Sequence, residues 1–311
     1  MFEIETIKIL GIDCLENCLV NLTNWYLGQY KGAFSELFQF RFDLQPGESV
    51  DGYLFRDKSH VVDCLERYYG IYNSTVNVSK DHSLEVLDSI FALDQPVVFM
   101  TSTYYCRWLP EYQKIDKLRF LILLDRQSDG ILCEDPISDC HRVSMPIQDY
   151  FSGYRKIHRV NKPIRDVSDA RIMLQGTTMF LKEQQLEKQF DRFLTYMEHI
   201  STVHGLYNNI KGNVWYSNFD EYIGYYMSNT PLLYQAFLQE LCMKFSIDLE
   251  EENLLLHKIS RSWRYLRNEL FKSYVTDRYN QHKISILNRI KSLKYYSIAI
   301  RDQLVQKLES C

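Results

Sequence analysis

Glycine and proline are scarce in this 311-residue chain, which contains 12 glycines and 7 prolines. Loop-rich and repeat-β proteins rely on these two residues at their turns, so the composition argues against both architectures. The sequence also has no internal repeat, no low-complexity tract and no glycine-rich phosphate-binding loop. We therefore expect a globular chain built from regular elements.

Long apolar runs and paired cysteines are also missing. No apolar run approaches the ~20 residues that a membrane helix requires, and the longest, such as FLILL at 120–124, suit buried strands. The eight cysteines form no CxxC pair and no cluster with zinc-binding spacing, so no metal site is expected. A chain of this length needs no disulfide bonds for stability and shows no signal peptide, so we expect reduced thiols and a cytoplasmic location.

Hydrophobic residues make up 46% of the chain and charged residues 24%, which is enough for one large or two ordinary packed domains. The net charge of −4 is unevenly distributed, because Lys258–Lys307 contains 12 basic and 3 acidic residues, a balance of 12 − 3 = +9. A basic segment of this kind can be a solvated helical face, a dock for the acidic remainder of the chain, or a site for an anionic partner.

Residues 1–160 have the pattern of a mixed α and β domain. Short strands are predicted at Ile4–Leu10 and Glu36–Leu44, where apolar residues alternate. Arg119–Leu124 and Gly130–Glu134 predict a β-hairpin joined by a polar link.

The pattern changes near Pro163. Strand alternation disappears, and apolar residues recur every three or four positions in segments such as Asp248–Val275. We expect a helical domain of four or five helices over residues 161–311, entered by a linker at 158–168.

Cys14 stands where a Gly-Ile-Asp loop enters an amphipathic helix within Gly11–Tyr30. Unpaired backbone N–H groups and the helix dipole stabilise a thiolate at this position, as nucleophilic cysteine enzymes require. This arrangement predicts a pKa below the ~8.5 of a free cysteine. The alternative is a buried cysteine that only packs, as cysteine often does.

Two stretches carry a resemblance to a known family: DCLENCLVNLTNWYLG at the cysteine helix, and TSTYYCRWLPEYQKIDKLRFLILLDRQSDGILCEDP around the hairpin. With the helical C-terminal half, they resemble the family of butirosin biosynthesis protein H, through its N-terminal domain. The resemblance implies an α+β fold, with a papain/transglutaminase-like cysteine domain over residues 1–160 followed by an α-helical domain. It also implies a cysteine acyltransferase that moves an acyl or peptidyl group from a carrier-protein thioester to an amine in specialised-metabolite biosynthesis.

The same resemblance assigns roles to residues. Cys14 matches the family's nucleophile, and Asp135 matches the carboxylate that orients its histidine, although an Asp-Pro pair is also a common turn. The histidine itself is replaced by Arg119. Arginine keeps its proton in proteins and cannot act as a general base. His141, close to Asp135 in the sequence, is the candidate substitute base, and the alternative is an exposed loop histidine.

Four aromatic residues precede the hairpin, and they either line a substrate channel or cap the core: Tyr104, Tyr105, Trp108 and Tyr112. Cys18 lies one helical turn after Cys14, as a redox partner or, more simply, as a packed thiol.

Two functions follow. The first is an enzyme that uses Cys14 and needs no cofactor of its own, since the phosphopantetheine arm belongs to the partner. The second is a catalytically degenerate relative that binds a carrier protein or an active paralogue. The expected partners are an acyl or peptidyl carrier protein and a small-molecule amine, with a homodimer as an option and neither nucleic acid nor membrane expected.

Overall fold

The computed structural model describes residues 2–42, 59–138, 140–161, 169–207 and 218–310. The chain forms two compact units, and each unit is made of two separate stretches of the sequence. A sheet unit comprises Met1–Ala33 and Val62–Ser168, and a helical unit comprises Phe34–Val61 and Asp169–Cys311. The expected division between residues 160 and 161 assigns 34–61 to the first domain, whereas the described residues of this segment, 34–42 and 59–61, belong to the helical unit.

The sheet unit is built on one antiparallel sheet of six strands with the order β1-β6-β2-β3-β4-β5. The strands are β1 (Asn73–Val76), β2 (Val97–Ser102), β3 (Leu118–Arg126), β4 (Gly130–Glu134), β5 (Val143–Pro146) and β6 (Lys156–Val160). The predicted hairpin is confirmed as β3 and β4, with Ile122 opposite Glu134 and a bulge between Leu123 and Asp125. The fold is therefore α+β, as expected.

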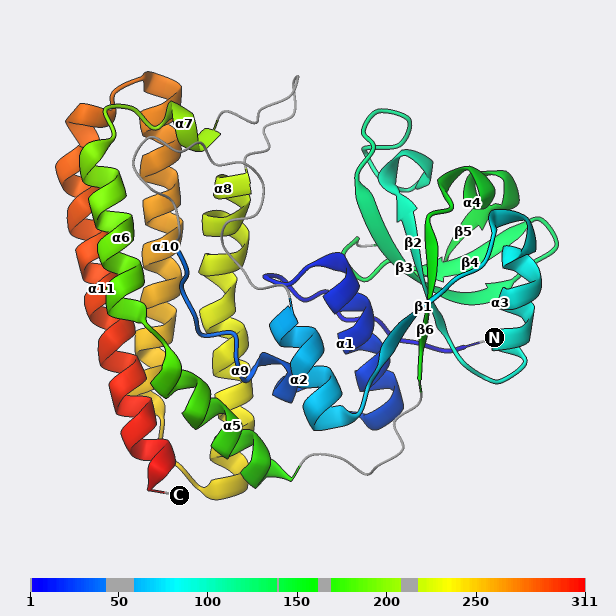
Figure 1. Cartoon of the computed structure of the whole chain (residues 1–311), viewed down its shortest axis with the longest axis horizontal. Helices are drawn as coiled ribbons and strands as arrows, with labels where there is room; N and C mark the ends of the chain where they lie inside the picture. Colours follow the sequence, from blue (N-terminus) through cyan, green and yellow to red (C-terminus); the bar gives the residue numbers. More distant parts are fainter. Residues whose placement is uncertain (1, 43–58, 139, 162–168, 208–217, 311) are drawn as a thin grey trace. The chain divides into compact units, whose positions relative to one another are not determined.

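Helices cover both faces of this sheet. In Figure 1, α1 (Cys14–Leu27) lies on one side of the strands, and α3 (Ser83–Phe91) and α4 (Ile147–Gly153) lie on the other. The core under α3 and α4 includes Phe99, Leu121 and Tyr150. The alternate strand residue Ile122 is equally buried, which is what burial on both faces requires.

The helical unit consists mainly of five helices longer than ten residues. These are α5 (Ala170–Glu183), α6 (Leu186–His199), α9 (Ser228–Phe245), α10 (Glu250–Thr276) and α11 (Tyr279–Glu309). The single turns α7 (His204–Tyr207) and α8 (Asn218–Glu221) and a π-helical segment, η4 (Tyr222–Met227), complete its described regular structure. α2 (Ser59–Tyr69) begins in the helical unit and ends in the sheet unit. Within the described residues, no helix is both long and apolar enough to cross a membrane.

The strand predicted at Glu36–Leu44 is wrong over the residues that the structure describes, 36–42, which pair with no strand. Its alternating aromatics instead pack among helices: Phe40 contacts Phe190 at 4.4 Å and Trp263 at 5.2 Å between ring centroids. The side-chain oxygen of Gln189 accepts a hydrogen bond from the Phe42 backbone at 2.7 Å. The period of two correctly indicated alternating burial over 38–42, but it carries no information about the element that buries these side chains.

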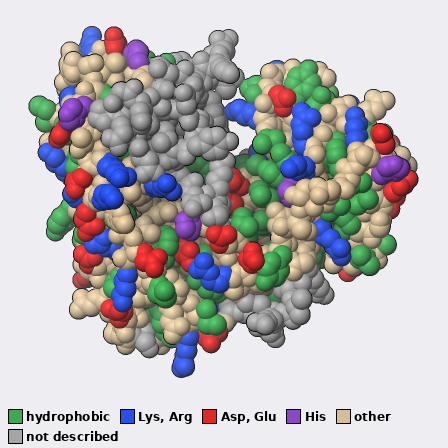
Figure 2. Space-filling model, viewed as in Figure 1, with side chains coloured by type: hydrophobic (Ala, Val, Ile, Leu, Met, Phe, Trp, Pro, Cys, Tyr) green, Lys and Arg blue, Asp and Glu red, His purple; other side chains and the backbone are tan. Residues whose placement is uncertain are grey.

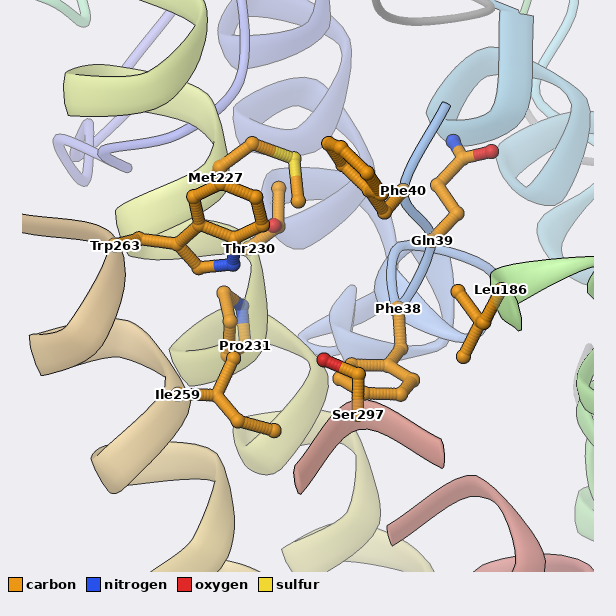
Figure 3. Close-up of a pocket in the computed structure, with 10 residues that line it drawn as sticks. All are labelled: Phe38, Gln39, Phe40, Leu186, Met227, Thr230, Pro231, Ile259, Trp263 and Ser297. Atoms are coloured by element: carbon orange, nitrogen blue, oxygen red, sulfur yellow. The ribbon is translucent and has the colours of Figure 1, made fainter. Parts of the chain in front are cut away.

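A small cavity lies beside these aromatics (Figure 3). Phe38, Phe40 and Trp263 point toward it together with the hydroxyl groups of Thr230 and Ser297. Its volume of about 10 Å³ is at the lower limit for one water molecule. We therefore regard it as a packing defect of the helical core and not as a ligand site.

Much of the charge in the basic segment is neutralised inside the helical unit. Lys294 of α11 pairs with Asp191 of α6, and Arg301 pairs with Glu187. Figure 2 accordingly shows basic and acidic side chains intermixed on the visible face of this unit. For these cations, the interpretation as a dock for acidic residues of the same chain is confirmed.

Candidate functional site

Cys14 is the first residue of α1, and the sequence before it forms a complete helix cap. Gly11 has a positive φ of 95°, which glycine adopts without strain. The Asp13 carboxylate accepts a hydrogen bond from Glu16 N at 2.9 Å, and Glu16 returns one by accepting from Asp13 N at 2.7 Å. This capping box fixes the start of the helix and presents a half-buried thiol there.

The segment before the cap is attached to the same helix by two asparagines. Asn17 Oδ1 accepts from Ile9 N at 3.0 Å while its Nδ2 donates to Ile9 O at 3.0 Å. Asn21 makes the equivalent pair with Ile7, at 2.6 and 2.9 Å. The strand predicted at Ile4–Leu10 is therefore wrong: side-chain amides of a helix take the place of a neighbouring strand.

Asp135 and Arg119 form the second part of the site, as a buried ion pair between the start of β3 and the end of β4. Arg119 Nη2 lies 2.5 Å from Asp135 Oδ1, and Nε lies 3.1 Å from Oδ2. Asp135 is fully buried and the Arg119 side chain is 14% exposed. Two parallel N–H···O bonds of this kind are the strongest geometry that arginine offers a carboxylate.

Further donors saturate the Asp135 carboxylate. Trp108 Nε1 donates to Oδ2 at 2.9 Å, and the backbone N–H groups of Ile137 and Ser138 approach Oδ1 at 3.3 and 3.4 Å. Burial acts to lower the pKa of Arg119, but Asp135 raises it above its ordinary value. The guanidinium therefore stays charged, and a carboxylate with five donors has no free site for orienting a histidine.

The thiol pKa contradicts the prediction. Burial, with a smaller effect of Asp13, raises the pKa of Cys14 to about 11, although the Phe120 backbone N–H and Arg119 act in the opposite direction. Burial is the main cause of this difference, and the helix cap adds to it because Asp13 places a negative carboxylate beside the thiol. The favourable field of the helix N-terminus does not compensate for desolvation and for this neighbour.

His141, the candidate substitute base, has other partners. Its Nδ1 lies 3.3 Å from Glu134 Oε2 and 3.1 Å from the Thr6 hydroxyl, and its side chain is 62% exposed. No hydrogen bond or ion pair joins it to Cys14 within the described part of the chain. These contacts match the exposed loop histidine that we considered as the alternative.

The four aromatic residues that precede the hairpin make different contacts in the structure. Trp108 joins the site through Asp135, which sequence reasoning missed because nothing in the pattern signals an indole–carboxylate bond. Tyr104 and Tyr105 contact each other with ring centroids 5.2 Å apart, and the Tyr112 hydroxyl accepts from Gln113 at 3.1 Å. Among the described contacts, none links these three tyrosines to Cys14.

Buried thiols surround the ion pair. Cys18 is fully buried, and burial raises its pKa well above the ordinary value, with a further increase from Cys14. Burial raises the pKa of Cys106 to about 12, and Asp135 acts in the same direction. Both thiols remain protonated at neutral pH, so the packed-thiol interpretation of Cys18 agrees with the structure. Over the described residues, no group of three His, Cys, Asp or Glu side chains is arranged to hold a metal ion.

Comparison of the sequence with models of known protein families found no match, and comparison with curated proteins found none either.

Proposed function

We propose that this chain is a non-catalytic relative of papain-like cysteine acyltransferases that acts by binding. The observation that carries the proposal is the bidentate Arg119–Asp135 ion pair. It occupies the two positions at which the resembling family has histidine and its orienting carboxylate. A general base contributes typically 10²–10⁴-fold to such a reaction, and arginine cannot supply that contribution.

The state of the thiol supports the same proposal. Burial raises the pKa of Cys14 to about 11, so the thiol is protonated at neutral pH. A neutral thiol is a poor nucleophile, so both elements of the acyl-transfer site are weakened together. The binding partner that the resemblance suggests is an acyl or peptidyl carrier protein, or an active paralogue.

One observation favours the enzyme as a second candidate. Cys14 is half-buried at a capped helix start, and Arg119 lowers its pKa against the effect of burial. If a substrate displaces Asp13 from the thiol or supplies its own base, for example the acceptor amine, the thiol can ionise. In that case Arg119 stabilises the thiolate and the oxyanion of the tetrahedral intermediate.

The experiment that separates the two uses a carrier protein loaded with an acyl thioester. Thioester cleavage is measured for the unmodified protein, for Cys14→Ala and for His141→Ala, and carrier binding is measured by titration calorimetry. We expect the thioester to remain intact at the same background rate in all three, with carrier binding unchanged by Cys14→Ala. Cleavage that disappears in Cys14→Ala establishes the enzyme, and absence of both cleavage and binding refutes the carrier-binding function.

A further inference from the structure

A groove on the helical unit, remote in the sequence from the cysteine site, carries the next inference. Its volume is about 560 Å³, within the range of small-molecule sites. Six of its lining residues come from α10 and one from α11: Leu254, His257, Lys258, Arg261, Ser262, Tyr265 and Arg289. Those from α10 recur every three or four positions, so they form a single stripe about 16 Å long on one side of that helix.

The two central cations of this stripe are not neutralised by an ion pair among the described residues. Lys258 and Arg261 are exposed and have no acidic partner among the residues that the structure describes. In contrast, Arg267 on the following turns is held by Asp220 through two hydrogen bonds of 2.8 and 2.7 Å. Within the groove, the positive charges of Lys258 and Arg261 are therefore available to an anion, whereas that of Arg267 is not.

Aromatic rings hold two of the cations in place. The Lys258 ammonium lies 3.9 Å from the centroid of the Tyr296 ring, and the Arg289 guanidinium lies 5.3 Å from that of Tyr265. Arg289 is also paired with Glu269 at 2.9 Å. A ring beneath an ammonium group orders it without neutralising it, so its charge stays available to an anion.

The apolar part of the groove is small but open. Leu254 is 66% exposed and Tyr265 is 58% exposed, one at each end of the stripe. A partner helix needs apolar anchors on successive turns, which this stripe lacks, since its centre is Lys258 and Arg261. A compact dianion with one apolar body fits this arrangement better.

The geometry points to a binding site for a small phosphate monoester, with the phosphate at Lys258 and Arg261 and its apolar group against Leu254. A phosphate monoester carries ≈ −1.5 to −2 charge at neutral pH, and a guanidinium binds phosphate oxygens bidentately. This site is independent of the proposed function at Cys14, and no step of chemistry is assigned to it.

The test uses phenyl phosphate and inorganic phosphate as probes in calorimetric titrations of the full chain. We expect phenyl phosphate to bind more tightly than inorganic phosphate, and Arg261→Gln or Lys258→Gln to weaken both by about tenfold. Leu254→Ala should remove the preference for the phenyl compound and leave inorganic phosphate unaffected.

Lys272→Gln and Lys291→Gln are matched controls, because they remove one exposed cation each from the same two helices outside the groove. Equal weakening by these controls would mean attraction to the general positive charge and would overturn the site. No saturable binding of phenyl phosphate, or binding only of a glutamate-rich helical peptide, would overturn it as well, the latter in favour of a protein-docking face.

Discussion

Two ion pairs of this chain, one in each unit, differ in how deeply they are buried. In the sheet unit, the Arg119–Asp135 pair is buried, with exposed fractions of 14% and 0%. In the helical unit, pairs such as Lys294–Asp191 lie at the surface, with fractions of 26% and 60%. Solvent screens the second kind, so each contributes only about 0–1 kcal/mol, whereas breaking a buried pair is costly.

This difference in burial bears on function, because the partners of a buried ion pair cannot readily leave one another. Neither partner of the Arg119–Asp135 pair can turn toward a substrate without leaving the other charge unpaired in the interior. The surface cations of α10 and α11 have no such constraint and can exchange water for a ligand. In the function that we propose, this constraint removes the general base from the site at Cys14, whereas the exposed cations of the helical unit are not constrained in this way.

The largest expected effect comes from breaking the buried pair on one side. Asp135→Asn leaves the Arg119 guanidinium without a counter-charge, and we expect the free energy of unfolding to fall by about 3–5 kcal/mol. Urea denaturation followed by circular dichroism measures it. The matched control is Glu187→Gln in the helical unit. If the two substitutions cost the same, the buried pair is not the structural element that we describe.

A buried histidine provides the second comparison within the sheet unit. His158 on β6 is 9% exposed, and within the described residues neither ring nitrogen has a hydrogen-bond partner. Burial, with a smaller effect of Lys156, lowers its pKa below the ordinary 6.5, so the folded protein holds the neutral form. Because the unfolded chain binds the proton more readily, stability should fall as the pH drops through 6.5.

We therefore expect His158→Leu to stabilise the protein by about 1 kcal/mol at neutral pH, since it removes an unsatisfied buried group. It should also remove the loss of stability below pH 6.5. His82→Leu is the control, because His82 is an exposed histidine of the same unit with 70% of its side chain accessible. If the stability of His158→Leu still falls below pH 6.5 as it does in the unmodified protein, His158 has a hydrogen-bond partner in solution and our interpretation is wrong.

The smallest effect is expected at the surface of the helical unit. Arg301 Nη1 and Nη2 donate to the Glu187 carboxylate at 2.8 and 2.7 Å and lower the pKa of Glu187 to about 2. The stabilisation is present above the ordinary pKa of 4.5 and is lost as the pH falls toward 2. Since Glu187 is 48% exposed, we expect Glu187→Gln to cost less than about 1 kcal/mol, and less still in high salt. A cost that is independent of salt would contradict a solvent-screened pair.

Local patterns predicted the elements whose partners are close in the sequence. The β3–β4 hairpin follows from two apolar runs on either side of a short polar link. The two failed strands, Ile4–Leu10 and Glu36–Leu44, have extended patterns whose partners are helices. Asn17 and Gln189 satisfy their backbones, and these residues give no signal that they will do so.

The sequence predicts which residues form the candidate site, but it does not predict their protonation states or all of their hydrogen bonds. Sequence placed Arg119 near Asp135, which requires only the hairpin register. The protonation state of Cys14 depends on its burial and on the side-chain direction of Asp13, and both are set by packing that local sequence does not encode. The link from Trp108 to Asp135 spans 27 residues and was missed for the same reason.

Alkylation of Cys14 by iodoacetamide as a function of pH shows whether this thiol is an activated nucleophile. Peptide mapping by mass spectrometry follows each thiol separately, and the half-buried Cys140 of the same unit is the internal reference. We expect Cys14 to react no faster than Cys140 at neutral pH and its rate to increase with pH toward a midpoint near 11. A midpoint below the ~8.5 of a free cysteine would mean that Cys14 is an activated nucleophile. That result would contradict the proposal that the chain is non-catalytic.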